Sequence, residues 1–239
     1  MAISFIWKLL EGEGSTLWAI CSSSPFLARK MVTLEDIKGA EVIVELWAGD
    51  GAFTKRLCRL AQKLWKNPEK IFIIEIDPHL CEELIRNTPP EFRESIYCID
   101  VQALPELLRL KNISSIDLVI SGLPFVNLPR ELFVFVMTKI FWDFAHADTI
   151  FKQFTYISPD KNDIATNVSK YSKYAEQIVS IEMCFLNIPP AFVLTCKWFE
   201  KKVWHVVKSD VRTFHEVVTD IWVRFDEVKS KIKPSLKSS

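Results

Sequence analysis

The sequence has no excess of either charge and no cysteine pairs of the kind that bind metals. Thirty Lys and Arg residues balance thirty Asp and Glu residues, so the formal net charge at pH 7 is zero. Proteins dedicated to nucleic-acid binding usually carry a basic excess, so this balance argues against that class while allowing a local basic patch. The six cysteines form no Cys-x-x-Cys pair, and no His and Cys cluster has zinc-site spacing. We therefore expect a reduced protein with small buried thiols and no metal site.

Long apolar runs are also missing. No stretch approaches the roughly 18 apolar residues of a membrane-spanning helix, and the most apolar region, residues 131–145, contains Lys139 and Asp143. The first residues, MAISFIWKLLEGEGS, lack the basic start and the small-residue cleavage site of a signal peptide. If the protein meets a membrane, we expect a cytoplasmic protein that contacts the inner membrane surface peripherally.

The chain does contain alternating buried strands and helices. Hydrophobic residues make up 49% of its 239 residues, enough for a sizeable core. Apolar residues at helical spacing predict one helix from Phe53 onward and another over residues 130–144, and Pro78 marks the start of a helix between them. Alternation of this kind predicts a parallel sheet with helices on both faces, and the short Ile-Pro-Pro link between the last two strands predicts an antiparallel pair. The predicted strands are 41–46, 70–76, 94–100, 115–121, 148–156, 177–187 and 191–199.

Both ends of the chain differ from this middle part. Residues 2–10 are apolar nearly all round, and Ser24 before Pro25 predicts a helix start. Apolar residues recur every three or four positions from Val211 to Val228, which predicts a long amphipathic helix before a basic tail. We expect three regions: an N-terminal segment, 1–32, a central domain, 33–199, and a C-terminal helix and tail, 200–239.

The stretch VELWAGDGAFTKRL, residues 44–57, predicts a strand, a glycine turn and a helix. Such turns bind anionic or polar cofactors, because glycine allows close approach and the helix start offers free N–H groups. Acids end three successive predicted strands at Glu45, Glu75 and Asp100. Glu75 has the position of an acceptor for two ribose hydroxyls, and Asp100 that of an acceptor for an adenine amino group. The alternative is that each acid only begins a turn or caps a helix.

This constellation resembles the first motif of class I S-adenosylmethionine-dependent methyltransferases, an acid, any residue, and then Gly-x-Gly-x-Gly. Here it reads Glu45-Leu46-Trp47-Ala48-Gly49-Asp50-Gly51, with Trp47 in place of the first glycine. DNA cytosine and some RNA uracil methyltransferases carry an aromatic residue at that position. The turn can bind the cofactor if Trp47 has no need of a positive φ, which bulky residues avoid. Trp47 would then help to wall the methionine end of the pocket.

Further stretches resemble the bacterial phospholipid N-methyltransferases, which convert phosphatidylethanolamine to phosphatidylcholine. The resemblance covers about residues 15 to 198, and Ser-Gly-Leu-Pro-Phe at 121–125 and Asn-Ile-Pro-Pro-Ala-Phe at 187–192 are its most specific parts. It implies a Rossmann-like α/β fold with a mixed seven-stranded sheet, S-adenosylmethionine as cofactor, and a phospholipid substrate at the membrane surface. The N-terminal segment would cover the cofactor and contact the membrane.

The resemblance also implies roles for individual residues. Phe125, Tyr156 and Asn187 would face the acceptor, with Tyr156 and Asn187 as the catalytic pair. Tyr156 is the candidate for orienting the amine or relaying its proton, since the amine arrives as an ammonium ion. Aromatic side chains also suit a product with a quaternary ammonium group. The implied cofactor-binding residues are Ser24, Phe26, Glu45, Gly49, Gly51, Glu75, Ile76, Asp100, Val101, Ser121 and Gly122.

Two other functions remain open on the sequence. The rRNA adenine dimethylases share the Glu-Ile-Asp stretch, but they carry Asn-Leu-Pro-Tyr where this chain has Gly122-Leu123-Pro124-Phe125. The carbonyl of that asparagine accepts a hydrogen bond from the adenine amino group, which is a weak nucleophile. A deprotonated lipid amine is a strong nucleophile and does not need this acceptor. A degenerate methyltransferase fold that binds a lipid or a partner without catalysis is the third reading.

Overall fold

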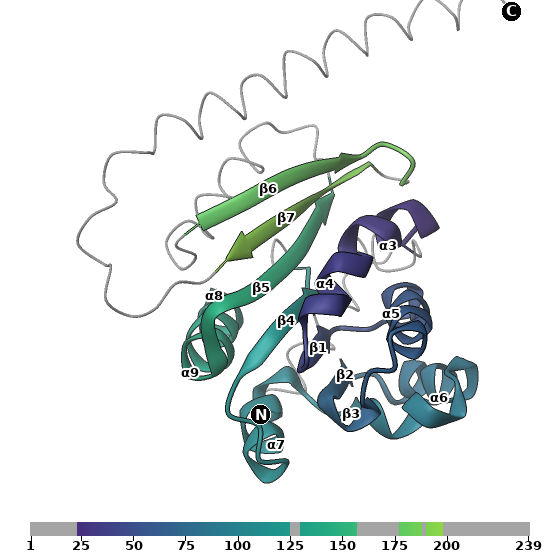
Figure 1. Cartoon of the computed structure of the whole chain (residues 1–239), viewed down its shortest axis with the longest axis vertical. Coiled ribbons are helices and arrows are strands. Elements are labelled where there is room, and N and C mark those ends of the chain that lie inside the picture. Colours follow the sequence, from purple (N-terminus) through teal and green to yellow (C-terminus); the bar gives the residue numbers. More distant parts are fainter. Residues whose placement is uncertain (1–22, 125–129, 157–176, 188–189, 198–239) are drawn as a thin grey trace, which may run out of the picture. The chain divides into compact units, whose positions relative to one another are not determined.

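The computed structural model describes residues 23–124, 130–156, 177–187 and 190–197, all of which belong to the first of two units, Met1–Phe199 and Glu200–Ser239. Within these ranges the chain forms a seven-stranded sheet of order β3-β2-β1-β4-β5-β7-β6 (Figure 1). β1 to β5 pair in parallel, and β7 runs antiparallel to both of its neighbours, β5 and β6, which confirms the predicted mixed sheet. The strands are β1 (Ile43–Leu46), β2 (Ile71–Glu75), β3 (Ile96–Cys98), β4 (Ile116–Ser121), β5 (Ala145–Tyr156), β6 (Gln177–Cys184) and β7 (Ala191–Lys197).

The two faces of the sheet carry separate apolar cores. β1 pairs with β2 on one side and with β4 on the other, and every residue of β1 is buried. Val44 and Leu46 belong to one core cluster and Ile43 to the other, because successive side chains of a strand point to opposite faces. Burial on both faces is the reason that these strands read as continuous apolar runs.

Helices cover both faces, as Figure 1 shows. One face packs against α3 (Pro25–Met31), α4 (Leu34–Gly39), α5 (Ala52–Lys63) and α6 (Pro78–Asn87). The other packs against α7 (Leu104–Leu110), α8 (Arg130–Phe135), the π-helix η4 (Val136–Phe141) and α9 (Trp142–Phe144). Short 3₁₀ helices are η1 (Pro68–Lys70), η2 (Pro90–Ser95) and η3 (Val101–Ala103).

Local signals explain where several helices begin. Ser24 caps α3 by accepting a hydrogen bond from the Leu27 N–H, and Pro25 is the first helical residue, as predicted. Thr33 and Asp36 form a capping box at the start of α4, a helix that the apolar spacing did not reveal. Asp77, before Pro78, caps α6 by accepting hydrogen bonds from the His79 and Leu80 N–H groups.

Several predicted boundaries need correction, among them the end of β6, which stops at Cys184 rather than at Asn187. Residues 94–95 belong to the 3₁₀ helix that starts at Pro90, so β3 covers only 96–98 rather than 94–100. The predicted helix 130–144 has a π-helical middle, and β5 follows it directly at Ala145, three residues earlier than predicted. The segment 2–10, the helix 211–228 and the basic tail lie outside the described residues.

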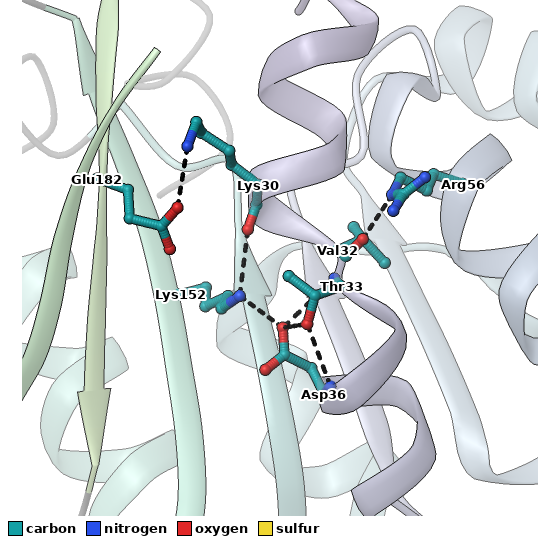
Figure 2. A network of polar contacts seen from close by, with 7 residues as sticks. All are labelled: Lys30, Val32, Thr33, Asp36, Arg56, Lys152 and Glu182. Carbon is teal, nitrogen blue, oxygen red and sulfur yellow. Dashed lines mark hydrogen bonds and ion pairs between the residues drawn. The ribbon is translucent and has the colours of Figure 1, made fainter.

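A polar network ties the N-terminal helices to the far half of the sheet (Figure 2). The Lys152 side chain on β5 is 3% exposed, and its Nζ lies 2.5 Å from Asp36 Oδ2 and 3.1 Å from the Lys30 carbonyl oxygen. Lys30 in turn contacts Glu182 Oε2 on β6 at 2.9 Å. A buried ammonium is tolerated only with such partners, so this network fixes α3 and α4 against β5 and β6.

None of the helices in the described parts of the chain is long and apolar enough to cross a membrane. Four of the five described cysteines are buried and all five are free thiols, with Cys98 exposed. Burial raises the pKa of the Cys58 and Cys196 thiols to about 12, so both stay protonated at neutral pH.

Candidate functional site

The turn after β1 has a left-handed backbone at three positions, Trp47 (φ 63°), Gly49 (φ 58°) and Gly51 (φ 81°). On the sequence alone, cofactor binding by this turn was conditional on Trp47 needing no positive φ. That condition is not met. Trp47 is held in this left-handed conformation because Leu46 is paired on both sides and the Ala48 N–H donates to the Ile74 carbonyl oxygen at 3.1 Å. Tertiary contacts thus override the preference of a bulky residue.

Gly122 allows the end of β4 to approach this turn closely. Its N–H donates to the Leu46 carbonyl oxygen at 2.8 Å, and a Cβ at this position would lie 2.5 Å from the Trp47 carbonyl oxygen. No residue with a side chain fits there without moving the turn. Gly122 was expected beside the cofactor, and the structure shows why it has to be glycine.

A pocket opens on the α7 and α8 face of the sheet, beneath the β1 turn. Four of its lining residues were expected at the cofactor, namely Trp47, Ile76, Asp100 and Val101. Asp100 is its one charged lining residue, and the Asp100 carboxylate caps η3 by accepting from the Gln102 N–H at 2.9 Å. The full lining is Trp47, Ile74, Ile76, Ile99, Asp100, Val101, Leu123 and Leu132.

Sequence reasoning missed four members of this lining. Ile74 and Ile99 lie next to the acids that mark the strand ends, and Leu123 lies inside the Ser-Gly-Leu-Pro-Phe stretch, so a local signal was present for all three. Leu132 reaches the pocket from α8, more than 30 residues after Asp100 along the chain, and only the packing of that helix reveals it.

The Glu75 side chain bonds the turn and is not among the residues that line the pocket. It is 2% exposed, and its carboxylate accepts three backbone N–H groups, from Gly49 at 2.7 Å, Ile76 at 2.9 Å and Asp77 at 3.0 Å. Burial raises the pKa of this carboxyl group, although the three hydrogen bonds act in the opposite direction. A carboxylate offers about four acceptor sites, so one remains for a ligand while the turn keeps its bonds. The two ribose contacts inferred from the sequence would need one of these bonds to be given up.

Glu45 is on β1, just before the turn, and its side chain points to the face of the sheet opposite the pocket. Its side chain is fully buried, and both carboxylate oxygens lie 3.0 Å from the Thr54 hydroxyl on α5. Burial raises the pKa of Glu45 from 4.5 to about 8, so the group is mostly protonated at neutral pH. Glu45 was expected to line the cofactor, but in this structure it joins the turn to α5.

Two predicted residues from opposite ends of the chain meet. The Ser24 N–H donates to Asn187 Oδ1 at 2.8 Å, across 163 residues of sequence. Asn187 is 1% exposed and follows β6, so it holds the start of α3 against the β6–β7 turn. Phe26, expected to cover the methionine end, is 46% exposed, and the Arg29 guanidinium lies 5.7 Å from the centre of its ring.

The ends of β4 and β5 bring together the other predicted residues. Ser121 is fully buried and pairs with Leu46 on one side and with Gln153 on the other. Tyr156 ends β5 on the α5 face, where its ring packs edge-on against Phe154 at 5.2 Å between ring centroids. Phe125 lies outside the described residues. In the described ranges no group of three or more His, Cys, Asp or Glu residues is arranged to hold a metal ion.

No family model matches the sequence. The chain is 30% identical over 129 residues to an ornithine lipid N-methyltransferase of Singulisphaera acidiphila, a match that covers 54% of this chain and 64% of that relative. The chain thus spans somewhat less than two thirds of the relative's length.

Solved structures resemble the chain in fold. An O-methyltransferase from Bacillus cereus in complex with SAH is 13% identical, has a TM-score of 0.50, and is matched over 81% of this chain and 90% of its own. Human methyltransferase-like protein 13 in complex with SAH is 11% identical, with a TM-score of 0.44 over 74% of this chain and 81% of its own. With the strand order, the first likeness confirms the predicted class I methyltransferase fold.

Proposed function

We propose that this chain is an S-adenosylmethionine-dependent N-methyltransferase that acts on the amine of a membrane lipid. The observation that carries the proposal is the apolar pocket beneath the β1 turn, which has Asp100 among its lining residues. The relative that shares 30% identity is named as an N-methyltransferase of a lipid, which supports the same reaction class.

The residues of the pocket fit an adenosine group. Trp47, Ile74 and Leu123 are apolar lining residues that suit a flat ring, and Asp100 is the lining residue to which we assign the amino group at the edge of that ring. Gly49 leaves open space, since a Cβ there would have no neighbour within 4 Å. Glu75 has one acceptor site left for a ribose hydroxyl. When bound, the cofactor supplies an electrophilic methyl group on a sulfonium, and the chain has to align the acceptor with it and exclude water.

The acceptor that we propose is a primary amine carried by a lipid headgroup. Phosphatidylethanolamine, inferred from the sequence resemblance, and ornithine lipid, named in the relative, both have this chemistry. Gly122 supports a lipid amine over adenine, because a Cβ at that position would meet the Trp47 carbonyl oxygen and no asparagine fits. Tyr156 remains our candidate for orienting the amine. For Asn187 we propose a different role from the predicted one: its Oδ1 accepts from the Ser24 N–H and so holds the start of α3.

A lipid acceptor implies that the site faces a bilayer. Three exposed apolar side chains lie within two residues of Ser24 or Asn187 along the chain: Phe26 at 46%, Phe185 at 51% and Leu186 at 65% exposure. Exposed apolar groups of this kind mark interaction surfaces. We propose that they face the inner membrane surface together with residues 1–10, whose apolar character was noted from the sequence.

The test is transfer of a radiolabelled methyl group by the full chain. The acceptors are vesicles of phosphatidylethanolamine, vesicles of ornithine lipid, vesicles of phosphatidylcholine as a control without an acceptor amine, and ribosomal RNA. We expect label in one of the two amine lipids and none in the control. Label in RNA alone would show that the adenine dimethylase reading is the better one.

A specific observation favours a second function, a methyltransferase fold that binds lipid without catalysis. Trp47 occupies the first-glycine position with φ 63°, and the Glu75 carboxylate is turned into the turn. Titration calorimetry with S-adenosylmethionine separates the two readings. Binding in the micromolar range supports the enzyme, whereas absence of binding together with intact vesicle association supports the second function.

A further inference from the structure

Gln153 on β5 is a buried polar side chain that none of the sequence motifs explains. It is 2% exposed and lies next to Ser121 of β4 in the sheet. Its Nε2 donates to the Leu123 carbonyl oxygen at 2.9 Å and to the Phe154 carbonyl oxygen at 2.7 Å. Among the residues that the structure describes, Gln153 Oε1 is the buried side-chain oxygen that lacks a hydrogen-bond partner.

The surroundings of the amide decide which end is oxygen. The nitrogen end faces two carbonyl oxygens, which accept but cannot donate. If the amide were turned over, Oε1 would face both of these acceptors and two more hydrogen bonds would be lost. The oxygen is therefore the end without a donor. Buried polar atoms in native proteins nearly always have partners, so a buried carbonyl left over in this way points to a donor supplied by a ligand.

The position of Gln153 ties it to the candidate site. Leu123 lines the pocket, and both ends of its peptide are held: its N–H faces the Ser121 Oγ at 3.4 Å and its carbonyl oxygen accepts from Gln153. Side chains alternate along β5, so Gln153 points to the pocket face while Lys152 reaches α4 on the other. Ser121 is paired with Leu46 at the start of the glycine turn, so one β4 residue separates Gln153 from that turn.

We propose that Gln153 Oε1 accepts a hydrogen bond from an N–H of the acceptor amine during methyl transfer, an inference that rests on the proposed function. The lone pair of the neutral amine forms the N–C bond while the C–S bond breaks. The electron pair of the C–S bond stays on the sulfur, which becomes a thioether. The nitrogen becomes a substituted ammonium and later releases a proton to water. Its N–H groups are stronger donors as this positive charge develops, so the bond to Oε1 is strongest in the transition state.

The contribution of Oε1 therefore depends on how many methyl groups the amine already has. A neutral primary amine has two N–H groups, a secondary amine has one, and a tertiary amine has none. Gln153 should assist the first and second transfers and leave the third unchanged. A residue that only holds Leu123 would affect all three transfers alike.

The experiment compares wild type with Gln153→Met, a substitution of similar size that removes the amide. Turnover is measured on vesicles of phosphatidylethanolamine and of its N-methyl and N,N-dimethyl derivatives, and on the same series made from ornithine lipid. We expect kcat to fall about 10- to 100-fold on the first two substrates, in the range for a lost hydrogen bond to a charged group, and to stay within about 2-fold on the third. Gln62→Met, on the exposed side of α5, is the matched control and should leave all three rates unchanged.

Equal losses on all three substrates would overturn the inference and leave Gln153 a structural role. If wild type methylates no member of either series, the proposed function fails and the inference fails with it. A second measurement does not depend on the variant's folding or on turnover. The ¹³C signal of the Gln153 side-chain carbonyl should shift when wild type with bound S-adenosylhomocysteine meets phosphatidylethanolamine micelles, but not with phosphatidylcholine, which has no N–H. An identical response to both lipids would contradict a hydrogen bond to the amine.

Discussion

Replacing Glu45 with glutamine tests whether the acid under the β1 turn is a buried, protonated group. The Glu45 side chain has no exposed surface, and its carboxyl oxygens bond the hydroxyl and the backbone N–H of Thr54. Desolvation is the main cause that raises its pKa, with the negative charges of Glu75 and Asp50 adding to it. Glutamine has the same shape and can still bond Thr54, but it cannot ionise.

The magnitude follows from the two pKa values. Below pH 4.5 the carboxyl is protonated in both the folded and the unfolded chain, so no stability is lost. Between pH 4.5 and about 8 the unfolded chain releases a proton that the folded chain retains, and the free energy of unfolding falls with rising pH. The full difference corresponds to roughly 5 kcal/mol, of which about 3 to 4 kcal/mol fall between pH 5 and pH 8. That is a large share of the roughly 5–15 kcal/mol that holds a typical domain folded.

The assay is urea denaturation of wild type and Glu45→Gln at several pH values. Glutamine should gain about 3 to 4 kcal/mol relative to wild type as the pH rises from 5 to 8. Glu94→Gln, at an exposed position, should show a nearly constant difference from wild type over the same range. A Glu45→Gln difference that changes by less than about 1 kcal/mol would refute a buried neutral carboxyl group.

Three further predictions concern the pocket, the turn and the membrane. Asp100→Ala should weaken S-adenosylmethionine binding about 10-fold in calorimetry through loss of a charged acceptor, and an unchanged Kd would remove Asp100 from the site. Gly122→Ala should destabilise the chain by about 1–3 kcal/mol, because its Cβ would lie 2.5 Å from a carbonyl oxygen of the turn, while Gly39→Ala, with no neighbour within 4 Å, should be tolerated in the same thermal melt. Deletion of residues 1–10 should abolish sedimentation with liposomes, and Leu186→Ser should weaken it; if neither variant changes sedimentation, these segments are not the membrane contact.

Much of the fold could be predicted because its signals are local. Buried apolar runs such as residues 41–46 and 70–76 identify strands without knowledge of their neighbours. Ser24 before Pro25 similarly identifies a helix start from two adjacent residues. The order of the strands is not local, and the sequence did not predict it; the resemblance implied only a mixed seven-stranded sheet.

The parts that could not be predicted depend on contacts across the chain. Lys152 reads as a surface residue within a strand, yet it is buried, since Asp36 reaches it from a helix 116 residues earlier. Gln153 carries no signal in the sequence, because its importance rests on the carbonyl oxygens of Leu123 and Phe154 around its amide. Such pairings appear only when the backbone is in place.

Trp47 and Gly122 together explain how the turn tolerates the loss of its first glycine. A bulky residue with φ 63° costs on the order of 1–3 kcal/mol, and it persists only where surrounding contacts determine the backbone. Here β2 and β4 hold Leu46 on both sides, and Gly122 removes the Cβ that would meet the Trp47 carbonyl oxygen. The small residue that the turn needs is thus found on the neighbouring strand. The indole in turn forms an apolar wall of the pocket, so the substitution that weakens the motif as a sequence pattern adds surface for a ligand ring.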